Sequence, residues 1–198
     1  MSDEGKVWIA VDGGTTFTMN FTNEKTATAG KITTIKREGL VDLGLSDGTL
    51  WADKNVGATT YGDAGEYYNF NAAQTAVSSP LSVPKGGEAS AADNDFAILN
   101  NSCTWKWTDG YGGGSSAGYI VYKKGGSDIS KDAHIFLPAA GYRYGGGVGG
   151  LGGRGYYWSS TEDDADRGFS LRFRSGLVGP DSYDDRGFEF SVRAVRRK

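Results

Sequence analysis

The chain has 198 residues, of which 32 are glycine and 13% are aromatic, and its formal net charge is −3 at pH 7. The aromatic content excludes a disordered polar chain, and the absence of a three-residue glycine period excludes collagen. The balanced charge provides no field that attracts nucleic acid or an anionic membrane, so we expect neither as a partner. The length suits one sizeable domain, or one domain with a fragment of another.

The counts of reactive residues exclude several kinds of chemistry. Cys103 is the only cysteine and His134 the only histidine, which rules out an internal disulfide and a cysteine-based metal cage. We therefore expect no enzyme, no cofactor and no bound metal. Apolar runs fall short of the ~18 residues of a membrane span, and residues 1–6 do not resemble a signal peptide. We expect no direct membrane insertion, with any secretion signal or anchor outside this chain.

The first 38 residues form a short β segment in this interpretation. Lys6–Val11, Thr15–Thr22 and Lys31–Glu38 alternate apolar and polar residues with period two, which predicts three strands. Three strands do not make a sandwich alone. The segment is either an extension of the sheet that follows or the tail of an upstream β-sandwich.

Residues 39–198 have a different texture, rich in glycine, aspartate and aromatic residues. A helix is predicted from Ser90, as the N-cap, to Asn100. The glycine-rich stretch Gly145–Gly155 is either a flexible loop or a place where backbones pack closely. Strands are predicted at Cys103–Trp107, Gly118–Lys124 and His134–Arg143.

Alternation near the C-terminus predicts a hairpin. Its first strand contains Phe169–Arg174, and its second contains Phe188–Val195. Most of the polar residues that alternate with the apolar ones in both strands, such as Arg172, Ser191 and Arg193, are predicted to face outward. Ser175–Gly187 is predicted to be a long polar connection between them.

Five blocks of sequence follow one another from residue 39 onward: VDLGLSDGTLWADKNVGA (Val41 to Ala58), NNSCTWKW (Asn100 to Trp107), IFLPAAGYR (Ile135 to Arg143), GYYWSST (Gly155 to Thr161) and FSVRAVR (Phe190 to Arg196). In these blocks the chain resembles the Fibrobacter succinogenes major paralogous domain, which is widespread in surface lipoproteins of Bacteroidetes. Glu189 and Ala194 depart from the family, which usually has glycine and proline there. The resemblance implies an α+β, C-type lectin-like (formylglycine-generating-enzyme-like) fold, mostly β with one or two short helices.

The family is also similar to the variable proteins of diversity-generating retroelements, which end in a related segment rewritten by adenine-directed mutagenesis. Mutagenised AAY codons never give Glu, Lys, Gln, Met or Trp, and Asp163–Phe188 contains none of these five residue types. The resemblance therefore implies a variable binding surface within about residues 160–190.

The residue types of this window suit a binding surface, because aromatic and arginine side chains anchor partners while small polar groups adapt to them. The open alternative is an ordinary solvated hairpin rim, with Phe169 and Phe188 in the core. Alternation points five residues away from this surface, so we expect them to be scaffold: Leu171, Phe173, Val178, Phe190 and Val192. The predicted ligand-binding residues are Asp164, Asp166, Arg167, Phe169, Ser170, Arg172, Arg174, Leu177, Asp181, Ser182, Tyr183, Asp184, Asp185 and Phe188.

Other candidate sites have simpler interpretations. Glu162–Asp166 has the oxygen ligands for calcium, but its spacing matches no EF-hand loop and the lectin motifs EPN, QPD and WND are absent, so a solvated acidic loop is favoured. Trp105 and Trp107 suit sugar stacking or the core, and the core is favoured. Cys103 lacks the second cysteine that formylglycine-generating relatives need, so we expect a buried apolar side chain. Tyr157 and Trp158 are expected to pack, with Ser159 and Ser160 bonding nearby backbone groups and His134 in a structural role.

We expect a ligand-binding protein of receptor or adhesin type that displays a diversified surface, with a protein as ligand and a glycan as the alternative. An invariant structural or adhesive module of a cell-surface lipoprotein, and a carbohydrate-binding lectin, remain open. The expected location is the cell surface or outside the cell, or alternatively a phage virion.

Overall fold

The computed structural model describes residues 6–11, 15–20, 39–111, 115–126 and 133–197. The chain divides into two compact units, Met1–Glu38 and Gly39–Lys198. The boundary falls where the sequence changes from alternating segments to a texture rich in glycine, aspartate and aromatic residues.

The N-terminal unit contains two strands, β1 (Lys6–Val11) and β2 (Thr15–Asn20), which pair antiparallel. Both were predicted from period-two alternation, and the last two residues of the second predicted strand, 21 and 22, lie outside the described residues. Among the described strands, β1 and β2 pair only with each other. The third predicted strand, Lys31–Glu38, lies outside the described residues.

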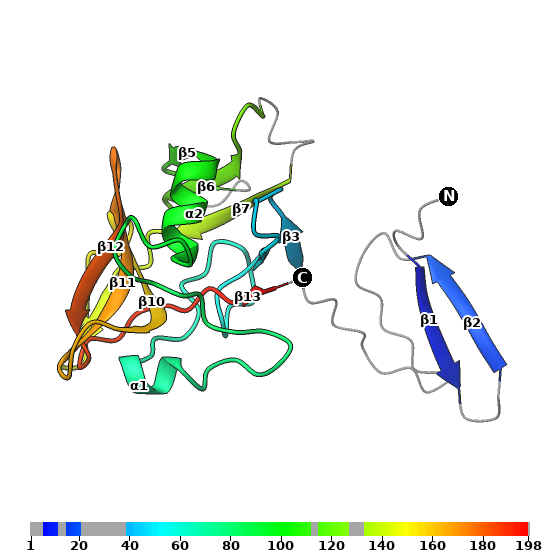
Figure 1. Ribbon diagram of the computed structural model, residues 1–198, viewed down its shortest axis with the longest axis horizontal. Coiled ribbons are helices and arrows are strands. Elements are labelled where there is room, and N and C mark those ends of the chain that lie inside the picture. Colours follow the sequence, from blue (N-terminus) through cyan, green and yellow to red (C-terminus); the bar gives the residue numbers. More distant parts are fainter. Residues whose placement is uncertain (1–5, 12–14, 21–38, 112–114, 127–132, 198) are drawn as a thin grey trace. The chain divides into compact units, whose positions relative to one another are not determined.

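The C-terminal unit is mostly β, with two short helices among its described residues (Figure 1). This is the β-rich α+β class that we expected. Neither helix is long and apolar enough to cross a membrane. In chain order, the elements are β3 (Leu40–Asp42), β4 (Leu50–Ala52), α1 (Phe70–Ala73), α2 (Asp95–Ser102), β5 (Cys103–Thr108), β6 (Gly118–Lys123), β7 (His134–Pro138), β8 (Tyr142–Tyr144), β9 (Gly147–Gly149), β10 (Arg154–Glu162), β11 (Arg167–Arg174), β12 (Leu177–Asp185) and β13 (Val195–Arg196).

The strands of this unit form several small antiparallel sheets. Their strand orders are β13-β4-β3, β5-β6-β7, β10-β11-β12 and β8-β9. The last strand, β13, pairs with β4, so that Val195 lies opposite Trp51. The C-terminal segment therefore returns through the unit to its first strands, as the red part of the chain in Figure 1 shows.

Helix α2 begins later than predicted. We expected a helix from Ser90 to Asn100, but the N-cap is Asn94, whose Oδ1 accepts a hydrogen bond from the amide of Ala97 at 3.0 Å. The side-chain amide of Asn94 also donates to the carbonyl of Gly87 at 2.7 Å, and this bond ties the preceding turns to the helix start. Helix α1 was not predicted, because four residues are too few to show a helical period.

The C-terminal hairpin differs from the predicted one. β11 pairs with β12, a segment that we expected to be a connection, through a two-residue turn of Ser175 and Gly176. Gly176 has a φ of +79°, which glycine adopts without strain. The glycine, proline and aspartate of β12 disfavour a strand, which is why alternation missed it. The strand is tolerated because β12 is an edge strand and Pro180 falls at the bulge in its pairing.

The predicted second strand of that hairpin, Phe188–Val195, is mostly irregular. Isolated bridges join it to its neighbours, including one between Ser191 and Tyr157 on β10. Ser191 and Arg193 are fully buried, so the prediction that most polar residues of this strand face outward was wrong. The segment passes through the interior of the unit, where both alternating faces are covered.

Two hydrophobic clusters fill the unit, one on each face of the β10-β11-β12 sheet. The larger joins that sheet to α2 and to β5-β6-β7, with Leu137 and Phe173 among its residues. The second includes Phe70, Trp158 and Phe190. The predicted scaffold is confirmed, because four of its five residues are buried and Val178 packs against the larger cluster: Leu171, Phe173, Phe190 and Val192 are the buried four.

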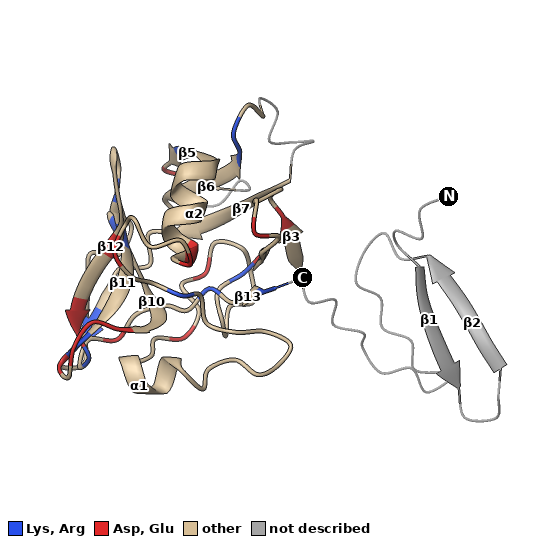
Figure 2. Cartoon of the chain, viewed as in Figure 1, with Lys and Arg blue, Asp and Glu red and all other residues tan. Residues whose placement is uncertain are grey.

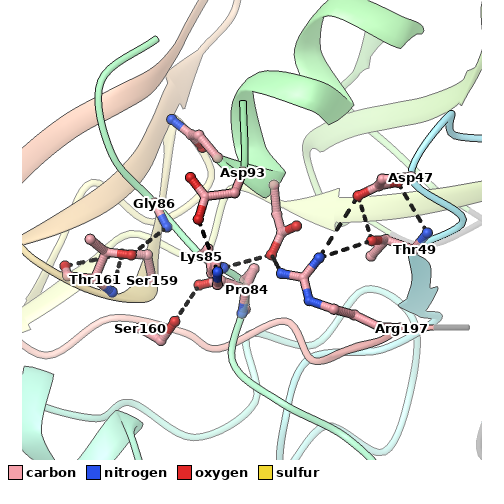
Figure 3. A network of polar contacts seen from close by, with 12 residues as sticks. Asp47, Thr49, Pro84, Lys85, Gly86, Asp93, Ser159, Ser160, Thr161 and Arg197 are labelled. Carbon is pink, nitrogen blue, oxygen red and sulfur yellow. Dashed lines mark hydrogen bonds and ion pairs between the residues drawn. The ribbon is translucent and has the colours of Figure 1, made fainter. Parts of the chain in front are cut away.

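A network of polar contacts holds the C-terminal segment to the start of α2 (Figure 3). The buried Asp95 accepts hydrogen bonds from the backbone amide of Lys85 at 2.6 Å and from the guanidinium of Arg197 at 2.9 Å. Burial raises the pKa of the Asp95 carboxyl. The next amide, that of Gly86, donates to Oγ1 of Thr161 at 3.0 Å. The loop before α2 is thus fixed on one side to the helix and on the other to β10.

Candidate functional site

The predicted ligand-binding residues do not share one face of the β10-β11-β12 sheet. Residues directly opposite each other in an antiparallel pair point to the same face. Ser170 lies opposite Ser182 on one face, and Phe169 lies opposite Tyr183 on the other. Phe169, Ser170 and Asp184 are buried, so including these three residues in a solvent-facing surface was wrong.

The acidic end of this sheet neutralises its own charges, which Figure 2 shows as adjoining red and blue segments. The guanidinium of Arg167 forms ion pairs with Asp163 at 2.9 Å and with Asp164 at 2.7 Å. The hydrogen bond from Arg167 lowers the pKa of Asp164. Arg186 pairs with Glu162 at 3.2 Å. Because these arginines and carboxylates pair within the hairpin, this end is a weaker candidate for a ligand site.

Three further predicted aspartates, Asp166, Asp181 and Asp185, are exposed. Over the whole described part of the chain, no group of three or more His, Cys, Asp and Glu side chains is arranged to hold a metal ion.

At the opposite end of the sheet, three arginines share one face. Arg154 on β10 lies directly opposite Arg174 on β11, and Arg172 lies two residues along β11, on the same face. Arg154 and Arg174 are exposed, and neither forms an ion pair with a described carboxylate. Leu177, which lies opposite Arg174 on β12, is 55% exposed. Two like charges therefore face each other beside an exposed apolar side chain.

A buried carboxylate fixes the direction of Arg172. The Nε of Arg172 donates to Oδ2 of Asp184 at 2.7 Å, and its Nη2 contacts Oδ1 of the same carboxylate. The hydroxyl of Ser170 donates to Oδ2 of Asp184, also at 2.7 Å. The guanidinium then lies over the ring of Tyr156, 5.7 Å from its centre. Ser170 and Asp184 thus act beneath the surface, where two-point contact with the guanidinium fixes its direction.

Aromatic side chains extend this face beyond β10. Tyr156 packs edge-on against Tyr142, with ring centres 5.2 Å apart, and Tyr142 packs in the same way against Phe188 at 5.5 Å. Tyr144 stacks on Phe188 at 4.6 Å and remains 61% exposed. An isolated bridge at Gly141 joins the start of β8 to β10. The result is a continuous row of rings that begins at an exposed tyrosine and ends beneath an arginine.

We call this surface the Arg–Tyr face. Its members are Arg154, Arg172, Arg174, Leu177, Tyr142, Tyr144, Tyr156 and Phe188. The four members from β11, β12 and the segment after them were predicted, and the four from β8 and β10 were missed. They were missed because periodicity does not reveal that β8 and β10 are neighbours across a glycine-rich stretch. The available signal was compositional, since YRY and RGYY on either side of that stretch repeat the same two residue types.

The residues considered for catalysis or sugar stacking, Cys103, Trp105 and Trp107, pack against other side chains in the structure. Cys103 is 6% exposed, and burial raises the pKa of its thiol to about 11, which confirms a buried apolar side chain. Trp105 and Trp107 pack edge-on against Tyr119, with ring centres 5.4 and 5.2 Å apart. Both tryptophans are partly buried and pack against the larger cluster, which agrees with the favoured packing role.

Ser159 and His134 have structural roles, as expected. The hydroxyl of Ser159 donates to the carbonyl of Phe169 at 2.7 Å. The Nε2 of His134 lies 2.9 Å from the hydroxyl of Tyr111. These contacts occupy the serine and the histidine in holding neighbouring segments together.

A cavity of about 400 Å³ lies beside the network of Figure 3. Valine, leucine, serine and glutamine side chains line it, together with Lys85 and Arg197. Both cations already have carboxylate partners at 2.9 Å, Asp93 for the lysine and Asp95 for the arginine. The Arg–Tyr face is the stronger candidate for a ligand site, because two of its cations lack such partners among the described residues.

A scan against models of protein families and searches of curated proteins and of solved structures find no match to this chain. The candidate site therefore rests on the geometry of the described residues.

Proposed function

We propose that residues 39–198 form a ligand-binding module, without catalytic activity, whose Arg–Tyr face contacts a protein partner. The observation that carries the proposal is the row of oriented tyrosine and arginine side chains on the Arg–Tyr face. Tyr144, Arg154 and Arg174 are exposed, and the other tyrosines and arginine of the row are partly buried. Tyrosine and arginine are enriched among the residues that supply most of the energy of protein interfaces. Rings that already pack against each other, as Tyr142, Tyr156 and Phe188 do, lose little further conformational freedom on binding.

We propose that the module has a C-type lectin-like fold. The support is the resemblance in five ordered blocks, together with the β-rich antiparallel architecture of the unit. Each block contributes buried residues, including Trp51, Cys103, Leu137, Tyr157 and Val192. In this proposal the blocks supply the scaffold, and six of the eight members of the Arg–Tyr face lie between blocks, while Tyr142 and Tyr156 lie inside them.

We propose further that a retroelement diversifies one half of the Arg–Tyr face. Arg172, Arg174, Leu177 and Phe188 fall inside the window Asp163–Phe188, and the other four members of the face lie outside it. In β11 the exposed Arg174 follows the buried Phe173, so a change at Arg174 leaves the core intact, whereas a change at the partly exposed Arg172 also removes the partner of the buried Asp184. In this proposal the module is displayed on a cell surface or a phage virion, where its binding partners vary and a variable surface is useful.

The DNA beside the gene tests the proposal. We expect a near-copy of the segment that encodes about residues 160–190, differing from it at adenines and lying next to a reverse transcriptase gene. Genome sequence from the source is sufficient for this test. If the complete neighbourhood contains no such copy, diversification is wrong, and an invariant structural or adhesive module becomes the better account.

A further inference from the structure

We propose that Arg154 and Arg174 form a subsite for the carboxylates of an acidic segment on the protein partner. The inference rests on the proposed function of the Arg–Tyr face and adds the chemistry of the partner.

The pairing of Arg154 with Arg174 costs the sheet some stability. Like charges directly opposite each other on neighbouring strands destabilise a sheet. Arg154 and Arg174 occupy such a pair of positions, and both are exposed. The aliphatic stem of Arg154 lies beside Gly150, a contact that needs no charge at the end of the side chain. A pair of cations that costs stability fits a role in binding.

The other arginines of the same sheet and its hairpin have carboxylate partners, in contrast to Arg154 and Arg174. Arg167 pairs with Asp163 and Asp164, and Arg172 pairs with Asp184. Arg186, just after β12, pairs with Glu162. The hairpin thus supplies an acid for each of these three arginines. Among the described carboxylates it supplies none for Arg154 and Arg174, so a partner can provide the missing acids.

The arginine pair lies beside aromatic and aliphatic side chains. Tyr156 lies two residues beyond Arg154 on the same face of β10, and Leu177 lies opposite Arg174 on β12. A carboxylate that bridges the two guanidinium groups accepts charge-assisted hydrogen bonds from both. Its aliphatic or aromatic neighbours then lie against Leu177 and the tyrosine rings. This complementarity favours an acidic protein segment that also carries apolar side chains.

Binding to the random copolymer poly(Glu,Tyr) tests the inference, with the complete chain and four variants measured by biolayer interferometry. We expect wild-type binding at 50 mM NaCl that weakens several-fold at about 150 mM, because salt screens exposed charges. Arg154→Gln and Arg174→Gln should each weaken binding about tenfold. Lys106→Gln, which removes one exposed cation from the β5-β6-β7 sheet, should change binding less than about twofold.

The fourth variant, Tyr144→Ser, separates the inference from the proposed function. If Tyr144→Ser weakens binding and neither arginine variant does, the face binds but the arginine subsite is wrong. If wild type does not bind poly(Glu,Tyr) at 50 mM NaCl, the inference is also wrong, and the DNA beside the gene still tests the proposed function. Binding to heparin without binding to poly(Glu,Tyr) assigns the pair to a sulfated glycan and overturns the acidic protein partner.

A measurement of thermal stability tests the cost argument without any ligand. Arg174→Glu places a carboxylate opposite Arg154, so it should raise the Tm by about 1–4 °C while removing binding to poly(Glu,Tyr). Lys106→Glu makes the same change of charge on another sheet and should leave binding almost unchanged. A Tm of Arg174→Glu below that of wild type contradicts the claim that the arginine pair costs stability.

Discussion

Replacing Arg193 by alanine is expected to lower the free energy of unfolding by about 3–5 kcal/mol. The guanidinium is fully buried, and it donates to Oδ1 of Asn55 at 2.9 Å, to the carbonyl of Ala52 at 3.0 Å and to the carbonyl of Phe136 at 2.6 Å. The acceptors lie in two segments far apart in the chain, since Ala52 ends β4, Asn55 follows it closely and Phe136 is on β7, and the substitution removes the donor to all three. Each unsatisfied buried group costs about 1–3 kcal/mol.

An opposing effect limits this loss. Burial lowers the pKa of the Arg193 guanidinium, which means that the charged form is poorly solvated in the folded protein. Removing the charge recovers part of that cost, so the net effect is smaller than the sum of three lost bonds. Arg193→Met removes the same donors and the same charge but keeps much of the side-chain volume, so its difference from Arg193→Ala measures the contribution of the lost volume.

Urea unfolding of Arg193→Ala, Arg193→Met and a control measures the effect. Arg196→Ala is the matched control, since Arg196 lies three residues further along the same segment and is only partly buried. We expect the control to stay within about 0.5 kcal/mol of wild type. Equal losses in Arg193→Ala and Arg196→Ala contradict the role of Arg193 as the donor that joins these segments.

Replacing Trp158 by alanine is expected to cost about 3–5 kcal/mol. Its ring is fully buried, stacks on Phe190 with centres 4.2 Å apart and meets the edge of Phe70 at 5.3 Å. Its Nε1 donates to the carbonyl of Tyr68 at 2.8 Å. The substitution therefore opens a cavity at the centre of the second cluster and removes one of the two hydrogen bonds that the carbonyl of Tyr68 accepts, the other coming from the amide of Phe190.

Two further variants resolve this prediction into its parts when unfolding is followed by circular dichroism. Trp158→Phe keeps a stacked ring and loses the hydrogen bond to Tyr68, so it should cost about 1–2 kcal/mol. Trp107→Ala removes a tryptophan that is only partly buried, and we expect a smaller loss than for Trp158→Ala. A larger loss for Trp107→Ala than for Trp158→Ala shows that the second cluster is not the tightly packed centre described here.

Alternation predicted the fold best where a strand has one clear buried face. In β11, Leu171 and Phe173 are buried while Arg172 between them is partly exposed, and period two follows directly from that arrangement. In β12 the same method failed, because an edge strand with a bulge tolerates Pro180 and needs little intrinsic β propensity. It failed again at Ser191 and Arg193, whose segment is covered on both sides and no longer alternates between core and solvent.

Four of the eight members of the Arg–Tyr face were predicted from the sequence, and the other four were missed for a related reason. Arg172 and Arg174 share a strand, so one period places them on one face. Tyr142 and Tyr156 come together only because β8 and β10 meet at an isolated bridge, which no local pattern predicts. The buried carboxylate of Asp184 was predicted as a surface residue, because its residue type is usually exposed and only its contacts with Ser170 and Arg172 place it inside.

In the proposed function, ligand recognition is altered by substitutions in the half of the Arg–Tyr face that lies within Asp163–Phe188. Sequencing this locus across a population of the source organism tests it most directly. We predict that substitutions gather at Arg172, Arg174, Leu177 and Phe188 while Leu171, Phe173 and Val192 remain unchanged. Substitutions spread evenly along the chain, or concentrated on the buried scaffold, contradict the claim.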